Sequence, residues 1–126
     1  MKPLLAVIAF FEAAFGLLLL VFPAGIVRLI FNAELAGIGT IAGRVAGIAI
    51  FALGVACWKG GTPEGALNGL LVYSVLVALY VLLIGIRGGF TGALLWPVVG
   101  IHAGLAIVLA RERFDDWKGA RAKRSD

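Results

Sequence analysis

The feature that most constrains this chain is a set of four long apolar runs separated by short polar breaks. The runs cover residues 4–22, 38–58, 66–86 and 91–110 of the 126-residue sequence. An α-helix rises about 1.5 Å per residue, so roughly 20 residues cross a hydrocarbon core of about 30 Å. Each run is long enough to do so. The sequence therefore predicts an all-α fold, a four-transmembrane-helix antiparallel bundle.

The composition excludes a soluble domain. Hydrophobic residues make up 62% of the chain and charged residues 14%, whereas soluble domains are about half apolar and about a quarter charged. A chain this short cannot bury so much apolar surface in its own core, so the excess must face lipid. The net charge of +4 does not indicate nucleic-acid binding, because the basic residues flank the apolar runs. The lipid bilayer is the first expected partner.

The breaks between the runs indicate how the spans connect. Residues 59–64 and 87–89 are tight, glycine-containing turns, which predict antiparallel pairing of the second run with the third and of the third with the fourth. The first break is longer and holds a short apolar stretch, residues 26–31, interrupted by Arg28. We expect an interfacial helical segment there and not a fifth span. The first run is too long for a signal-peptide core and contains Glu12, so we interpret it as a mature helix.

Lysine and arginine are distributed unevenly over the two sides of this four-span arrangement. Residues 1–110 form the expected transmembrane domain and residues 111–126 a basic tail. One side carries only Arg28 and Arg87. The other side carries Lys2, Lys59, Arg111, Arg113, Lys118, Arg121, Lys123 and Arg124. The positive-inside rule therefore predicts cytoplasmic termini, and we expect the tail to extend as a helix along anionic headgroups.

Polar side chains inside the runs are the candidate functional residues, because an ionisable group in hydrocarbon is costly unless it is paired or hydrated. At about 1.5 Å per residue from the outer helix ends, Glu12 lies about 15 Å deep, Arg44 about 9 Å and His102 about 17 Å. The predicted buried polar layer is Glu12, Arg44, Tyr73, Tyr80 and His102, with Glu12 and Arg44 paired. We favour a structural role for this layer over a proton or ligand site. The alternative for Arg44 is extension toward the outer surface.

Small residues at helical spacing predict where helices approach closely. The expected packing glycines are Gly39, Gly43, Gly47 and Gly54 in the second run, and Gly100 and Gly104 in the fourth. Glycine at this spacing lets two backbones come together in lipid. Arg44 lies angularly between Gly43 and Gly47, so the packed face is also expected to be the polar one. Its partner is either another helix of the bundle, which we favour, or another chain.

No catalytic constellation is expected from these residues. Glu12 is the only acid inside a span, and no serine, histidine and acid share plausible roles. The His and Cys residues have no metal-ligand spacing. Cys57 is expected to be an inert small hydrophobe. We therefore predict neither an enzyme nor a cofactor or metal site, and an enzyme acting on a lipid or quinone is the remaining alternative.

Three segments carry a resemblance to known proteins. These are the positions Glu12, Gly16 and Pro23, the segment GRVAGIAIFALGVACW from Gly43, and the segment ALLWPVVGIHAGLAIVLA from Ala93. They resemble a group of small four-helix bacterial membrane proteins, and the layout is similar, more loosely, to DoxX-like families and families of unknown function. The resemblance implies four spans and a bacterial inner (cytoplasmic) membrane. It implies no catalytic or binding residues.

Two functions follow as hypotheses. The first is a non-catalytic accessory or structural subunit that packs in a larger membrane protein assembly, suggested by the small size and the glycine faces. The second is a small homo-oligomeric transporter or channel that uses Glu12, Arg44 and His102. We favour the first, because a packed four-helix bundle leaves little room for an aqueous path. The expected protein partner is a membrane protein or a second copy of the chain.

Overall fold

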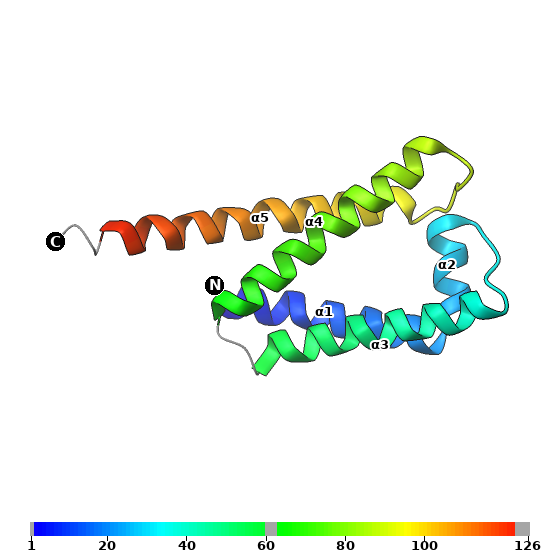
Figure 1. Cartoon of the computed structure of the whole chain (residues 1–126), viewed down its shortest axis with the longest axis horizontal. Helices are drawn as coiled ribbons and strands as arrows, with labels where there is room; N and C mark the ends of the chain where they lie inside the picture. The colour runs from blue at the N-terminus through cyan, green and yellow to red at the C-terminus, as the bar shows by residue number, and fades with distance from the viewer. Residues whose placement is uncertain (1, 60–62, 123–126) are drawn as a thin grey trace.

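The computed structural model describes residues 2–59 and 63–122. It contains α1 (Lys2–Val21), α2 (Pro23–Phe31), α3 (Ile38–Lys59), α4 (Pro63–Arg87) and α5 (Leu95–Ala122). These ranges hold no strand, and the four long helices alternate in direction (Figure 1). The predicted all-α class is confirmed. The expected tail residues Lys123 and Arg124 and part of the expected turn at 59–64 lie outside the described residues.

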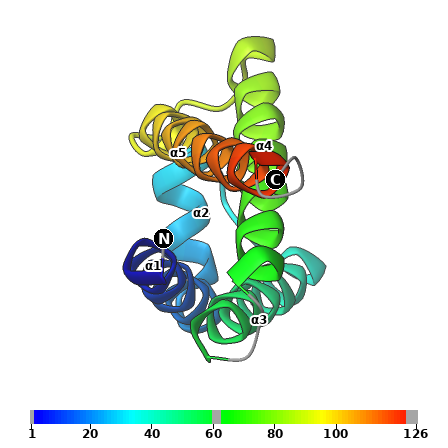
Figure 2. The same cartoon turned by 90° about the vertical axis from the view of Figure 1, so that its left-hand side faces the viewer.

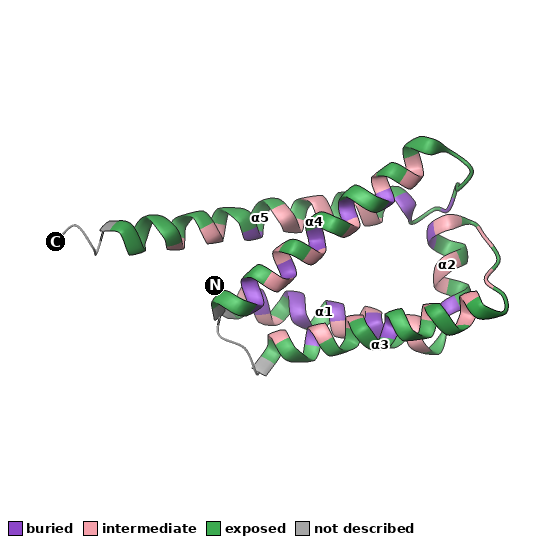
Figure 3. Cartoon of the chain, in the orientation of Figure 1, coloured by how far each residue is buried: buried purple, intermediate pink, exposed green. Residues whose placement is uncertain are grey.

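Four helices are long and apolar enough to cross a membrane: α1, α3, α4 and α5. Their outward faces are exposed along most of their length (Figure 3). These faces carry large apolar side chains such as Leu18, Ile48 and Leu79. In water such a surface would drive aggregation, whereas in a bilayer it is the surface that lipid contacts. The fold is that of a multi-pass membrane protein.

The predicted interfacial segment forms α2. The helix begins earlier than expected, at Pro23, because proline lacks an N–H that a first helical turn would leave unbonded and its ring presets the helical φ angle. It ends at Asn32, whose φ of 52° is left-handed and whose backbone N–H donates to the Arg28 carbonyl over 2.9 Å. At nine residues, α2 is too short to span a membrane.

The long helices form two pairs, α1 with α3 and α4 with α5. Figure 2 shows α1 beside α3, with α2 rising between the two pairs. The predicted pairing of α4 with α5 is present, but the expected pairing of α3 with α4 is wrong. Figure 1 shows α4 crossing from the end of the α1–α3 pair to α5. A tight turn brings two helix ends together without fixing the direction in which the helices leave it, and Gly47 and Gly54 of α3 face α1.

The start of α5 also differs from the expected span. The helix begins at Leu95 and not at residue 91, because the preceding segment bonds to α2: the Leu94 N–H donates to the Leu29 carbonyl over 2.9 Å. Gly88 and Gly89 supply the positive φ angles of the turn, 75° and 94°. At its other end α5 runs to Ala122 without a break. Its 28 residues are about 42 Å long, so the described part of the predicted tail continues the last span.

The apolar core lies at one end of the molecule, where α1, α4 and α5 converge. Its buried residues are Leu5, Ile8, Ala66, Leu67, Leu70 and Leu109, with Leu53 and Cys57 of α3 packed against them. At the other end α2 contacts α1, α3 and α5. Between these two anchors, no described Cα atom of α1 lies within 8 Å of one in α5. The two helices are therefore held apart along their middle.

Candidate functional site

A cavity of about 510 Å³ lies between α1 and α5. We call it the α1–α5 cleft. Its lining residues are Leu4, Val7, Ile8, Phe11, Glu12 and Phe15 from α1, together with Leu94, Pro97, Val98, Ile101, His102 and Leu105 from α5 or the residue before it. Its volume is that of pockets that hold small molecules. Only Glu12 and His102 among these residues carry polar side chains. The cleft is thus an apolar site with two polar groups.

Glu12 is nearly enclosed, with 7% of its surface exposed. The Tyr73 hydroxyl of α4 donates a side-chain hydrogen bond to its carboxyl group. A buried carboxyl group is tolerated only when such bonds replace the water it has lost. A carboxyl group accepts more than one hydrogen bond, and its protonated form can also donate one. The group keeps capacity beyond the bond to Tyr73.

His102 is oriented by its own helix. Its Nδ1–H donates to the Val98 carbonyl over 2.9 Å, because a carbonyl oxygen can only accept. The Tyr73 ring meets the imidazole edge-on, with 5.7 Å between the centroids. The other nitrogen, Nε2, is buried without a hydrogen-bond partner. The structure thus brings together Glu12, Tyr73 and His102, three of the five predicted layer residues, from three different helices.

The other two predicted layer residues lie elsewhere. Tyr80 is 66% exposed, and Arg44 is exposed too. A Cβ atom added at Gly54 would contact Ala13, the neighbour of Glu12. Arg44 lies ten residues before Gly54 in α3, about 15 Å along the axis. The predicted pairing of Glu12 with Arg44 is therefore wrong.

The depth error has a simple structural cause. The expectation assumed that the spans end at one level. In the structure, a Cβ atom added at Gly47 would lie 2.5 Å from the backbone nitrogen of Leu20, which is one residue from the end of α1. The helix α3 starts nine residues before Gly47, at Ile38. It therefore extends past α1, and its first turns, including Arg44, lie level with α2.

Two of the four predicted glycines of α3, Gly47 and Gly54, lie at the contact with α1. Cβ atoms built at Gly47 and Gly54 would come within 2.8 Å of Gly16 and 2.5 Å of Ala13 backbone atoms, respectively. Gly16 completes this contact from the α1 side and was not among the predicted packing residues. Gly43 faces the Pro23 side chain at 3.1 Å. A Cβ atom at Gly39 would meet only the side chain of Leu35, which lies in the connection between α2 and α3.

The prediction that Gly100 and Gly104 pack against another helix of the bundle is wrong. Both are exposed, and a Cβ atom at either position would meet nothing within 4 Å. They lie on a face of α5 that looks away from α4. Arg44 is also not on the packed face of α3, because a one-residue step turns the helix by about 100°.

The apolar wall of the cleft is what sequence reasoning missed. Phe15, Pro97 and Val98 are ordinary members of apolar runs, and nothing in the sequence distinguishes a residue that lines a cavity from one that faces lipid. Within residues 2–59 and 63–122, no group of three or more His, Cys, Asp or Glu side chains is placed to hold a metal ion. The cleft is the candidate site because it places Glu12 and His102 in the wall of an otherwise apolar cavity.

Comparison of the chain with protein-family models, with curated proteins and with solved structures finds no significant match.

Proposed function

We propose that this protein is a non-catalytic membrane protein that binds an uncharged, largely apolar molecule in the α1–α5 cleft. The single observation that carries the proposal is the cleft itself. It is about 510 Å³ in volume, and it lies between two spans whose described Cα atoms are nowhere within 8 Å of each other. Because it faces the hydrocarbon region, its occupant enters from the bilayer. Apolar ligand pockets with a few placed polar groups are the general form of small-molecule sites.

The polar groups favour an occupant with a hydrogen-bonding group over a plain acyl chain. Glu12 lies nine residues from the end of α1 and His102 seven residues from the start of α5, so both are about 10–14 Å below the helix ends. Lipid headgroups do not reach that depth. A carboxyl group at this level gains a hydrogen bond from a ligand hydroxyl that an alkyl chain cannot provide.

A matched pair of ligands tests this proposal. Para-nonylphenol and nonylbenzene share the ring and the chain and differ by one hydroxyl group. We expect native mass spectrometry of protein released from lipid nanodiscs to show saturable binding of the phenol, about tenfold tighter than that of the hydrocarbon, the ratio that one good hydrogen bond gives. In Glu12→Leu the preference is expected to fall.

The outcomes separate the alternatives. Equal binding of both ligands would mean that the cleft only holds hydrocarbon and would contradict the polar part of the proposal. Binding of neither ligand to the wild-type protein would overturn the proposal as a whole. Retention of the tenfold preference in Glu12→Leu would place the hydroxyl group elsewhere in the molecule.

The orientation in the membrane is part of the same proposal. We propose that both ends lie in the cytoplasm, with the protein in a bacterial inner membrane. The excess of lysine and arginine on the side of the termini supports this orientation. Reporter fusions at Glu34 and Gly88 are expected to read external, and fusions after Ala110 cytoplasmic. An external C-terminus would reverse the orientation without affecting the cleft.

Membership of a larger membrane assembly is a second candidate function, and it is compatible with the first. Two features support it. Gly100 and Gly104 leave open space on an exposed face of α5, and Arg44 is exposed in α3 without an ion pair to any described residue. A helix of a partner protein would pack into the space at Gly100 and Gly104, and an acidic group of the partner would form an ion pair with Arg44. Purification from native membranes after mild cross-linking tests this candidate: comigration with a larger protein supports it, and an isolated monomer contradicts it.

A further inference from the structure

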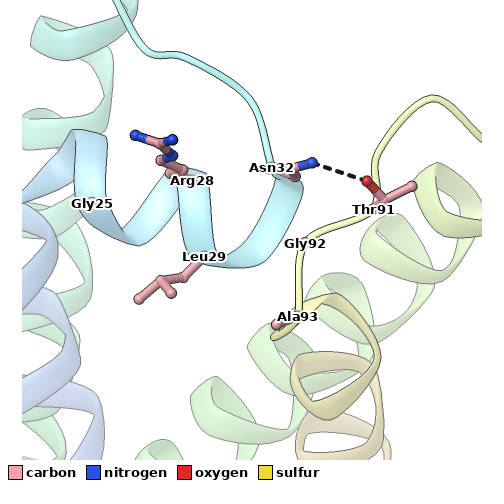
Figure 4. Close-up of a pocket in the computed structure, with 7 residues that line it drawn as sticks. All are labelled: Gly25, Arg28, Leu29, Asn32, Thr91, Gly92 and Ala93. Carbon is pink, nitrogen blue, oxygen red and sulfur yellow. Dashed lines mark hydrogen bonds between the residues drawn. The ribbon is translucent and has the colours of Figure 1, made fainter.

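A second pocket lies at the α2 end of the molecule, outside the α1–α5 cleft. It has a volume of about 570 Å³ and is lined by Gly25, Arg28, Leu29, Asn32, Thr91, Gly92 and Ala93 (Figure 4). Two segments far apart in sequence form it, α2 and the connection between α4 and α5. No acidic residue is among those that line it.

The pocket is preformed by contacts between these two segments. The Asn32 side-chain N–H donates to the Thr91 hydroxyl over 3.1 Å, and the Leu94 N–H donates to the Leu29 carbonyl over 2.9 Å. Gly92 packs so closely on the backbone of Ile30 that no Cβ atom fits there. These contacts tie the α4–α5 connection to the end of α2. The pocket therefore exists without a ligand to order it.

The groups at the rim of the pocket are hydrogen-bond donors. Arg28 lies in the last turn of α2, and Asn32 caps the end of the helix. Arg28 is exposed and forms no ion pair with any described residue. Asn32 uses one N–H on Thr91 and keeps a second, and the Thr91 hydroxyl accepts that bond and keeps its own proton. A guanidinium, an amide and a hydroxyl are together suited to a phosphate group.

The position of the pocket selects the source of the phosphate. The helix α2 follows the end of α1 and contacts the residues before α5, so it lies at the membrane surface. Figure 4 shows Leu29 pointing away from Arg28, and Leu29 is half exposed. This separation of an apolar and a cationic side is typical of a helix lying among lipid headgroups.

We propose that this pocket binds the headgroup of an anionic phospholipid, with Arg28 contacting the phosphate and Asn32 and Thr91 donating to its oxygens. The site differs from the α1–α5 cleft in its residues and in the class of its ligand. Its position at the junction of α2 with the α4–α5 connection means that a bound lipid bridges the two helix pairs. The bound lipid therefore stabilises the fold by binding the folded state alone.

Native mass spectrometry of protein released from nanodiscs of phosphatidylglycerol or phosphatidylcholine tests the site. The wild-type protein is expected to retain one molecule of phosphatidylglycerol with an affinity about tenfold higher than for phosphatidylcholine. Arg28→Gln is expected to lose this difference. Arg87→Gln is the matched control, because Arg87 is an exposed arginine at the same end of the molecule that does not line the pocket.

Each result decides the proposal. Equal retention by the wild-type protein and Arg28→Gln, or an equal loss in Arg87→Gln, would overturn it. Displacement of the lipid by millimolar inorganic phosphate would show a site for a free anion and would overturn the lipid assignment. Should Arg28→Gln fail to fold, Thr91→Val removes one donor and is expected to weaken retention several-fold; unchanged retention in Thr91→Val would also contradict the proposal.

Discussion

The two sides of α1 are built in opposite ways. Toward α3, Gly16 meets Gly47 and the backbones touch, so no side chain can be added. Toward α5, the large side chains of Phe11 and Phe15 border a cavity, and the two backbones stay apart. In lipid, close backbone packing holds helices together, whereas an unfilled apolar cavity loses dispersion contacts. The first side provides stability, and the second is the side that a ligand completes.

The largest expected effect is on the closed side. In Gly47→Leu the new Cβ atom would lie 2.5 Å from a backbone nitrogen and 2.8 Å from a carbonyl oxygen of α1, so the helices must separate. We expect a loss of about 3 kcal/mol in unfolding free energy, measured as a lower thermal midpoint in detergent. The control Gly100→Leu adds the same side chain where nothing lies within 4 Å and is expected to leave the midpoint unchanged. A similar midpoint for both variants would show that α1 and α3 are not packed by glycine.

The next effect concerns the hydrogen bond at the inner wall of the cleft. Tyr73→Phe leaves the buried Glu12 carboxyl group without its donor, which is expected to cost about 1–3 kcal/mol. Glu12→Leu leaves the Tyr73 hydroxyl without its acceptor. Because the two groups serve each other, the double variant is expected to recover part of the loss, with a coupling of about 0.5–3 kcal/mol. Strictly additive losses would mean that the two side chains do not meet.

Filling the open side is expected to change binding more than stability. Val98→Trp places a large apolar side chain in the α1–α5 cleft, where there is room for it. We expect para-nonylphenol affinity to fall at least about tenfold, with unfolding free energy changed by less than about 1 kcal/mol. Ile48→Trp, on the exposed face of α3, is the control that keeps binding. Unchanged binding in Val98→Trp would exclude the cleft as the site.

The smallest expected effect is at Arg44. Because the side chain is exposed and about 15 Å along the axis from the level of Glu12, Arg44→Gln is expected to change stability by less than about 0.5 kcal/mol in the isolated protein. Its effect is also expected to be additive with that of Glu12→Gln. A coupling above about 1 kcal/mol between these positions would restore the polar layer expected from the sequence and contradict the register of α1 and α3 described above.

The spans could be predicted from sequence because their signal is local. Run length and hydropathy place both ends of α1, α3 and α4 and the start of α5 to within a few residues, whereas α5 continues past the expected end of its span at residue 110. Gly47 and Gly54 mark a close contact. The helix that packs against these glycines was harder to predict. Short turns suggested α3 with α4, but turn length says little about the crossing of helices, and only the structure shows α3 lying along α1.

The candidate site was predictable only in part. Glu12 and His102 are conspicuous in apolar runs, and a depth estimate brings them together. The same estimate misplaced Arg44, because it assumed that all helices end at one level, and the insertion of α2 shifts α3 relative to α1. The cleft itself depends on the separation of the α1 and α5 backbones, a tertiary feature that no single run encodes.

Crystallography with a brominated ligand tests the central claim most directly. Crystals of the full chain soaked in a nonylphenol carrying one ring bromine give an anomalous signal that locates the ligand without reference to the protein. We expect one peak between α1 and α5, beside Glu12 and His102. A peak confined to the lipid-facing surfaces of α3 or α4, or α1 and α5 packed against each other with no peak between them, would contradict the account.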